Sequence, residues 1–355
     1  MKIESSMFAT GRFRAVVHKG HTYDEQGNIV EEGEVVVRDG VPQETQFGRN
    51  KLKLLYFTDM FAAGSDIAGC FVAGAGNTAP VEANRPLTSY LGKCTQHLSA
   101  TLTYSDTPDA EGYVYLRTVF RATFAPGAFG TGSKNVSEGG IAKGYTSNVT
   151  STTNLYAHGL LVDAGGSPTS VSVDTDSEYL DMFWEYTRYF KAEQTGTVSL
   201  NILGVPTDHA YVLRPSNWRV QGGTSTGGWY NDYFSASSII LYRPFGLSMS
   251  SDNNWTATQA ISGPIAVLTA FPTHTGYVSA HHASVATRQT QTNPKVQTWL
   301  VRWSTTAGNV PGGIGGVYLN GQSATSFQCS FSPKINKTSD QQLDLYFTMT
   351  LDNKP

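Results

Sequence analysis

The sequence GAGNTA has the residue types of a phosphate-binding turn. It matches the dinucleotide fingerprint G-x-G-x-x-A through Gly74, Gly76 and Ala79, and an apolar run precedes it. In that fingerprint the glycines let the backbone approach a pyrophosphate, which sits at the N-terminus of the following helix. Here Pro80 follows at once and Pro86 soon after, so that helix cannot form. The sequence therefore predicts a glycine turn that leaves a strand and continues as an extended arm, and no cofactor.

A second candidate for chemistry is Ser225, the central residue of a G-x-S-x-G match. A nucleophile elbow needs a buried strand before the serine and a helix after it. The residues that follow are aromatic and polar, which indicates a flexible loop instead. They include Trp229, Tyr230 and Tyr233, and aromatic groups of this kind bind sugars or partner proteins. These three residues are the candidate binding surface, although filling a β-sandwich core is the commoner role of such side chains.

Three carboxylates, Asp174, Asp176 and Glu178, share one face of an extended segment. Carboxylates in this number could bind calcium or serve a glycosidase. A calcium loop usually shows a longer pattern of ligands with a glycine at its turn. Because Asp and Glu are rarely buried unless they are paired, the pattern favours a solvated turn that leads into a strand beginning at Leu180.

Histidine and cysteine spacing predicts neither a metal site nor a disulfide framework. The chain has eight histidines without an H-x-H or H-E-x-x-H motif, and the adjacent His281 and His282 would point to opposite faces of a strand. Cys70, Cys94 and Cys329 are too few and too scattered for ligand or disulfide spacing. We expect buried free thiols, in a chain that folds in a reducing cytoplasm.

The elements that must position these residues are mostly strands. Alternation is clear over 113–124 and 343–351, where every second residue is apolar except Thr118. One buried face and one wet face are typical of antiparallel sheets. Helical patterning is nearly absent, except near 50–64, where Asn50 could begin a helix and Gly64 could end it. The sequence predicts an all-β protein with one short helix.

A faint internal repeat suggests how the strands are divided. Residues 139–141 align with 312–314, both reading GGI, and the pair 180–181 aligns with 343–344, both reading LD. A duplication of an antiparallel, jelly-roll-like β-sandwich explains this order, and chance similarity of short anchors is the alternative. The predicted parts are an N-terminal arm or hairpin, a first sandwich and a second sandwich, over residues 1–50, 51–200 and 201–355.

Composition narrows the class of protein further. Of 355 residues only 15% are charged, the formal net charge is −3, and no basic run appears, so we expect no nucleic-acid partner. The N-terminal stretch MKIESSMFATGRFR has no apolar signal-peptide core, and no other stretch is apolar enough to insert into a membrane. We expect a soluble chain, or one released as part of an assembled particle.

Residues 1–190 resemble a recurring type of virion structural protein of tailed bacteriophages. The resemblance rests, in order, on RFRAVVHKG, NKLKLLYFTDMF, DIAGCFVAGAGNTAPVEANRPLTSYLGK, FRATFAPGAF, NVSEGGIA and LYAHGLLVDAGGSPTSVSVDTDSEYLDMFWEYTRYF. It implies a non-enzymatic, β-rich component of the tail, neck, collar or baseplate of the virion. Its implied partners are copies of itself, in a ring or trimer, and other tail or neck proteins. The second half departs from the pattern except through the faint repeat.

Two other functions remain open from the sequence. A receptor-binding module would present loops such as 222–234 to a glycan on the host surface. A depolymerase would use the acids of 174–178. We expect neither catalytic nor cofactor-binding residues in the structural protein.

Overall fold

The computed structural model contains only strands as regular elements in the part of the chain that it describes, which confirms the predicted all-β class. The helix expected over 50–64 lies outside this part, and so do Ser225, Trp229, Tyr230 and Tyr233. The described residues are 1–25, 29–47, 70–81, 86–94, 97–105, 107–142, 149–202, 204–215, 248–250, 285–289, 292–293, 295–309, 312–321 and 324–353.

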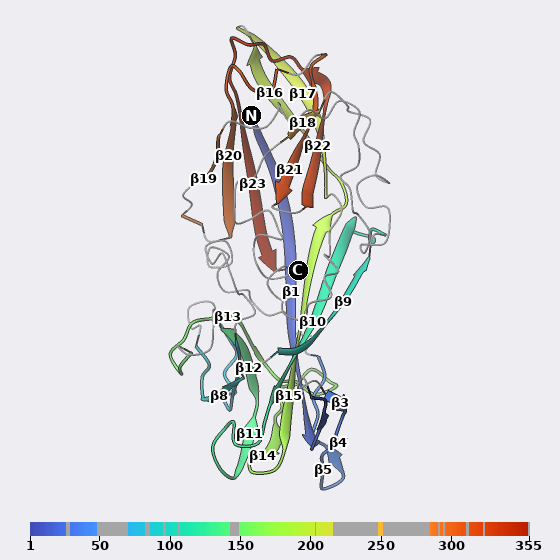
Figure 1. The fold of residues 1–355 in the computed structure, drawn as a ribbon, viewed down its shortest axis with the longest axis vertical. Coiled ribbons are helices and arrows are strands. Elements are labelled where there is room, and N and C mark those ends of the chain that lie inside the picture. The colour runs from blue at the N-terminus through green and yellow to red at the C-terminus, as the bar shows by residue number, and fades with distance from the viewer. Residues whose placement is uncertain are drawn as a thin grey trace.

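One large sheet runs through the molecule, with β1 (Lys2–Lys19) at its centre (Figure 1). β1 pairs antiparallel with β15 (Tyr179–Lys191) on one side and parallel with β23 (Leu343–Asn353) on the other. The sheet order is β19-β20-β23-β1-β15-β10-β9. Its other strands are β9 (His97–Ser105), β10 (Tyr113–Phe124), β19 (Val285–Arg288) and β20 (Val296–Trp303), with β4 (Glu34–Val35) paired to the end of β1.

Two smaller sheets and three short ribbons complete the fold. The four-stranded sheet contains β7 (Cys70–Gly74), β8 (Tyr90–Cys94), β12 (Glu138–Ala142) and β13 (Leu155–Leu160). The five-stranded sheet contains β16 (Gln194–Ile202), β17 (Val205–Pro215), β18 (Ser248–Ser250), β21 (Ile314–Gly321) and β22 (Ala324–Ile335). The ribbons pair β11 (Ser133–Val136) with β14 (Val171–Asp174), β2 (Thr22–Tyr23) with β3 (Ile29–Glu31), and β5 (Val37–Arg38) with β6 (Val41–Pro42).

Period-2 alternation explains which face of the large sheet is buried. Phe120 and Phe124 of β10 and Leu345 and Phe347 of β23 are all buried, as the alternation over those segments predicts. They belong to one hydrophobic core cluster, which also includes Trp184. Burying an aromatic or aliphatic side chain of this size stabilises the fold by roughly 1.5–3 kcal/mol. The inward face of the large sheet is therefore the main source of stability.

The large sheet crosses the boundary near residue 200 that the sequence suggests. It takes β19, β20 and β23 from the second half and the other strands from the first. Residues 2–19 also differ from the expected N-terminal arm, because they form the central strand of the sheet. Phe13, Ala15 and Val17 of β1 are buried in the common core, so this strand cannot be separated from the sheet. Residues 20–47 continue from it as short strands and hairpins, of which β4 stays paired to the end of β1.

The molecule is elongated. β16 and β17 lie at one end of the long axis, and β3–β5 lie at the other end, beside β11 and β14 (Figure 1). None of the described residues forms a helix that is long and apolar enough to cross a membrane.

Candidate functional site

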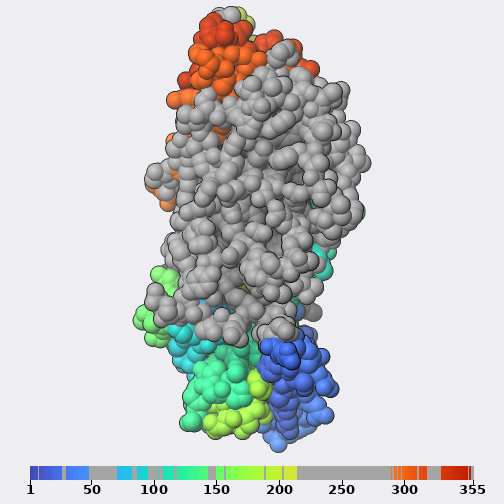
Figure 2. Space-filling model, viewed as in Figure 1, coloured from blue at the N-terminus to red at the C-terminus, as the bar shows by residue number. Residues whose placement is uncertain are grey.

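Exposed apolar side chains concentrate in residues 20–47, which we call the hairpin segment. Figure 2 shows this part of the chain, in blue, as a lobe at the lower end of the molecule. The described residues include eight large hydrophobic side chains that are exposed, and five of them lie here. We call these five the docking side chains: Tyr23, Val30, Val35, Val37 and Val41.

The β5–β6 hairpin exposes an apolar side chain on both of its faces. Val37 pairs with Pro42, and Arg38 pairs with Val41. Residues that pair across two strands share a face, so Val37 and Val41 point to opposite faces. Their exposed fractions are 57% and 59%. A hairpin of this kind can bury apolar area only against another surface.

The hairpin segment is strongly acidic. It contains seven carboxylates and one arginine, so its formal net charge is −6, whereas the whole chain carries −3. Glu25, Glu31, Glu34 and Asp39 are exposed. The docking side chains are thus surrounded by negative charge.

Backbone hydrogen bonds fix the hairpin segment along β1. The Val36 amide donates to the carbonyl of Val17 at 2.9 Å, and the Thr45 amide donates to the carbonyl of Ala15 at 2.9 Å. The Ala15 amide donates in turn to the hydroxyl of Thr45 at 2.9 Å. The side chains of Val36 and Thr45 are buried. The apolar residues that point outward are therefore held on a fixed support.

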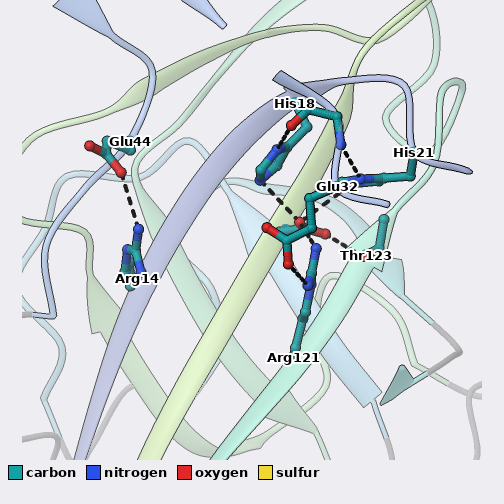
Figure 3. A network of polar contacts seen from close by, with 9 residues as sticks. Arg14, His18, His21, Glu32, Glu44, Arg121 and Thr123 are labelled. Atoms are coloured by element: carbon teal, nitrogen blue, oxygen red, sulfur yellow. Dashed lines mark hydrogen bonds and ion pairs between the residues drawn. The ribbon is translucent and has the colours of Figure 1, made fainter. Parts of the chain in front are cut away.

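Buried charges gather around Asp181 of β15. Figure 3 shows four of its partners, His18, His21, Arg121 and Thr123, pointing toward one another. The carboxylate of Asp181 is fully buried. It accepts hydrogen bonds from Arg121 Nη2 at 2.5 Å and from the hydroxyl of Thr123. His18 Nε2 lies 3.2 Å and His21 Nε2 lies 3.4 Å from Asp181 Oδ2. We call these five residues the Asp181 cluster.

Two histidines of the Asp181 cluster form hydrogen bonds with the backbone of Gly33. The Gly33 carbonyl accepts a hydrogen bond from His18 Nδ1 at 2.7 Å, and the Gly33 amide donates to His21 Nδ1 at 3.0 Å. Arg121 also pairs with Glu32 at 2.5 Å. A Cβ on residue 33 would overlap the carbonyl of Gly20, so only glycine fits here. The carbonyl of Gly33 is thus bonded to His18 of β1, and its amide to His21 within the hairpin segment.

The hydrogen-bond partners distinguish the two histidines. Both ring nitrogens of His18 face oxygens, the Gly33 carbonyl at Nδ1 and the Asp181 carboxylate at Nε2. His21 Nδ1 accepts the Gly33 amide, so a neutral His21 carries its proton on Nε2, toward Asp181. Burial lowers the pKa of His21, and the positive charges of His18 and Arg121 add to this, against the opposing effect of Asp181.

His18, His21 and Asp181 offer three possible metal-ligand atoms within 4.8 Å of one another. A metal would need the lone pair of His21 Nε2, but the Gly33 amide places the proton of the neutral ring on that nitrogen. The guanidinium of Arg121 also contacts the same oxygen of Asp181. The cluster therefore suits a proton better than a metal cation.

A second buried carboxylate, Glu138, holds the glycine turn that resembled a nucleotide site. Its Oε1 accepts the amides of Gly76 at 3.0 Å and Ser89 at 2.7 Å. Its Oε2 accepts the amide of Thr88 at 3.1 Å and His158 Nε2 at 2.8 Å. Burial raises the pKa of Glu138, but the combined effect of these hydrogen bonds in lowering it is larger. The pKa therefore lies below its ordinary value. The turn binds an anion that the chain itself supplies.

The chain after this turn forms no helix over residues 75–81, as Pro80 predicts. Part of the extended arm expected after it, residues 82–85, lies outside the described residues. The helix N-terminus that holds the pyrophosphate in a dinucleotide site therefore does not form over residues 75–81.

Asp174, Asp176 and Glu178 lie in a turn that is only partly exposed to solvent, whereas the sequence predicts a fully solvated turn. Asp176 is exposed, and its Oδ2 accepts the Gly132 amide at 3.1 Å. Glu178 is buried instead, because it pairs with Arg38 of the hairpin segment and accepts the Asp174 amide at 2.8 Å. The pairing supplies the compensation that a buried carboxylate needs.

Sequence reasoning missed the Asp181 cluster. The one local signal is the spacing H-x-x-H of His18 and His21, which is common and unspecific. Asp181 is distant in the sequence and reaches them only because it pairs with Val16 across β1 and β15.

No family model, curated protein or solved structure matches this chain.

Proposed function

We propose that this chain is a non-enzymatic structural component of a tailed-bacteriophage particle, in the tail, collar or baseplate region. It works through protein–protein interfaces with copies of itself, in a ring or trimer, and with other tail or neck proteins. The observation that carries the proposal is the concentration of exposed docking side chains on a segment that is firmly fixed to the sheet. The resemblance carried by residues 1–190 supports the location in the virion.

Because the docking side chains are exposed on a fixed support, an assembly interface explains their exposure better than chance does. Single exposed hydrophobic residues are normal, but the five docking side chains, gathered between Tyr23 and Val41, form a concentration that suits an interface. A segment that is already ordered loses little conformational freedom when it binds. The hairpin segment therefore has both the apolar area and the rigidity that an assembly interface uses.

The charge of the hairpin segment specifies its partner. With six net negative charges around apolar side chains, it fits a surface with an apolar centre and a rim of lysine or arginine. Complementary charge of this kind speeds association and selects among partners, and salt weakens it. The apolar contacts then provide the affinity.

The buried charges support a structural role. Asp181 and Glu138 each accept several hydrogen bonds from their own chain. Carboxylates satisfied in this way hold segments together and have little capacity left for a substrate. We assign both to the support of the fold.

The proposal is tested by mass spectrometry of purified phage particles, which gives the copy number of the chain. We expect a fixed copy number, and complete absence from particles would overturn the proposal. The double variant Val37→Asp/Val41→Asp is then supplied in place of the wild type. It should keep the wild-type circular dichroism spectrum and Tm, because both side chains are exposed, but fail to enter particles.

The control for that variant is Val205→Asp. Val205 is 62% exposed and begins β17, at the opposite end of the molecule. It should enter particles normally. Equal incorporation of the double variant would show that the hairpin segment is not the interface.

A further inference from the structure

Gly33 closes the base of the β2–β3 ribbon, since its amide donates to His21 and its carbonyl accepts from His18 of β1. We propose that the bond to His21 is a pH-sensitive latch: a second proton on His21 breaks this bond and opens the base of the ribbon, residues 21–33. These residues carry Tyr23 and Val30, two of the docking side chains. The consequence for docking rests on the proposed function, whereas the latch itself is a property of the isolated chain.

The stereochemistry of His21 makes the latch depend on its proton. The neutral ring accepts the Gly33 amide on Nδ1 at 3.0 Å and directs Nε2 toward Asp181. A second proton can go only to Nδ1, where two N–H groups would then face each other and the hydrogen bond is lost. In the closed arrangement Gly33 has no room to turn its amide away, because it lies against the carbonyls of Lys19 and Gly20. Protonation therefore requires the contact to open.

The groups around His21 oppose a second proton more than they favour it. Asp181 and Glu32 attract a positive charge, whereas Arg121 and His18 repel it, and burial disfavours it most. Every element packed against the ring contributes to this set: His18 from β1, Arg121 from β10, Tyr179 and Asp181 from β15, and Tyr23 and Glu32 from the hairpin segment.

The direction of the pH effect follows from this balance. Because burial lowers the pKa of His21 in the closed state, the open state binds the proton more tightly. The ratio of open to closed molecules is then independent of pH well above about 6.5, the ordinary pKa of histidine. As the pH falls below that value, the ratio rises by up to tenfold per unit. Acid opens the latch, and neutral pH closes it.

The opening is confined to one part of the hairpin segment. Residues 36–45 keep their own hydrogen bonds to β1, from Val36 to Val17 and from Thr45 to Ala15. Arg38 is paired with Glu178 in addition. None of these contacts involves a histidine, so they provide an internal control.

Hydrogen exchange, resolved to single amides of the full-length chain, tests the latch. Between pH 7.5 and 5.5, after correction for the intrinsic rate, we expect the protection factor of the Gly33 amide to fall, by at most about tenfold. The protection factors of the Val36 and Thr45 amides should stay unchanged. An unchanged Gly33 amide, or an equal fall at all three amides, would overturn the proposal.

The variant His21→Asn identifies the titrating group. An asparagine amide oxygen can take the place of Nδ1 as acceptor for Gly33 but does not titrate. Protection of the Gly33 amide should then be the same at both pH values, and a fall equal to that of the wild type would contradict the assignment to His21. If the variant does not fold, the three wild-type amides still decide the outcome. This experiment needs no particle, so its failure is distinct from failure of the proposed function.

Discussion

The backbone amide of Gly76 donates a 3.0 Å hydrogen bond to the carboxylate of Glu138, in a turn whose sequence matches a nucleotide fingerprint. A Cβ on Gly74 would lie 2.6 Å from the same oxygen, Oε1. The glycines are therefore needed for the reason that applies in nucleotide sites, namely close approach of the backbone to an anion. Here the anion is a side chain of the same protein.

Substitution Gly76→Ala should destabilise the fold. The new methyl group would overlap Glu138 Oε1 and approach Thr88 Cβ to within 2.5 Å. Overpacking together with a weakened charged hydrogen bond should lower the free energy of unfolding by about 2–4 kcal/mol. Urea denaturation measures this. Asn77→Ala, an exposed change in the same turn, should stay within about 0.5 kcal/mol of the wild type. Equal stability of the two variants would contradict the steric argument.

Substitution Glu138→Gln should change the acid response of stability. Because the pKa of Glu138 is lowered in the folded state, its contribution is present above about pH 4.5 and is lost as the pH falls through the folded value. The glutamine cannot titrate, and its NH₂ would face amide donors. It should cost about 2–4 kcal/mol at pH 7 and flatten the decline of stability between pH 5 and 3. Exposed Glu25→Gln is the control, and a slope as steep in Glu138→Gln as in that control would argue against this assignment.

Local patterns in the sequence predicted the strands but not their partners. The alternation over 113–124 and 343–351 fixed both the all-β class and the buried faces, because a side-chain period of two is a local property. The absence of a helix over residues 75–81 followed from Pro80 for the same reason. The partner of the glycine turn, Glu138, was not predictable, because it arrives from a strand 62 positions along the chain.

The role of β1 depends on long-range pairing in the same way. The sequence predicts an N-terminal arm or hairpin over residues 1–50, but the position of β1 at the centre of the sheet requires β15 and β23, which lie far along the chain. The Asp181 cluster forms only once that register exists, because His18 pairs with Tyr179. Few local features of residues 1–50 could have indicated the strand partners of β1.

Three strands follow β1 on each side of the large sheet, and on each side they run in reverse order of the sequence. On one side β15, β10 and β9 follow, and on the other side β23, β20 and β19. The aligned leucines also occupy equivalent positions, since Leu180 lies opposite Phe124 at the end of β10 and Leu343 lies opposite Trp303 at the end of β20. This symmetry is what a duplicated unit would produce, and the duplication stays a prediction.

The three thiols should be unreactive in the native protein. All are free and buried, as the sequence predicts. Burial raises the pKa of Cys70 to about 12 and raises the pKa of Cys329 as well, so little thiolate exists at pH 8. A thiol reagent should find no fast-reacting group before unfolding and three after it. The control Thr305→Cys, at an exposed site, should add one fast group. Rapid reaction of the wild type at pH 8 would contradict the burial.

The two halves of the chain contain a matched pair of aspartates. Substitution of the buried one should lower the free energy of unfolding far more than substitution of the other. Asp181 and Asp344 each occupy the second or third residue of the strand that flanks β1, and each pairs with an arginine of the next strand. Asp181 is fully buried, whereas Asp344 and its partner Arg302 are partly exposed. Asp181→Asn leaves Arg121 without its buried partner and should cost about 3–5 kcal/mol in urea denaturation.

Asp344→Asn should cost much less, because solvent screens an exposed pair. Its effect should also fade as salt is added, while the loss in Asp181→Asn should persist in 1 M salt, since a buried pair is poorly screened. Similar losses for both variants, with the same dependence on salt, would mean that burial does not set the strength of the Asp181 cluster. The latch at Gly33 would then have a weaker support than its geometry indicates.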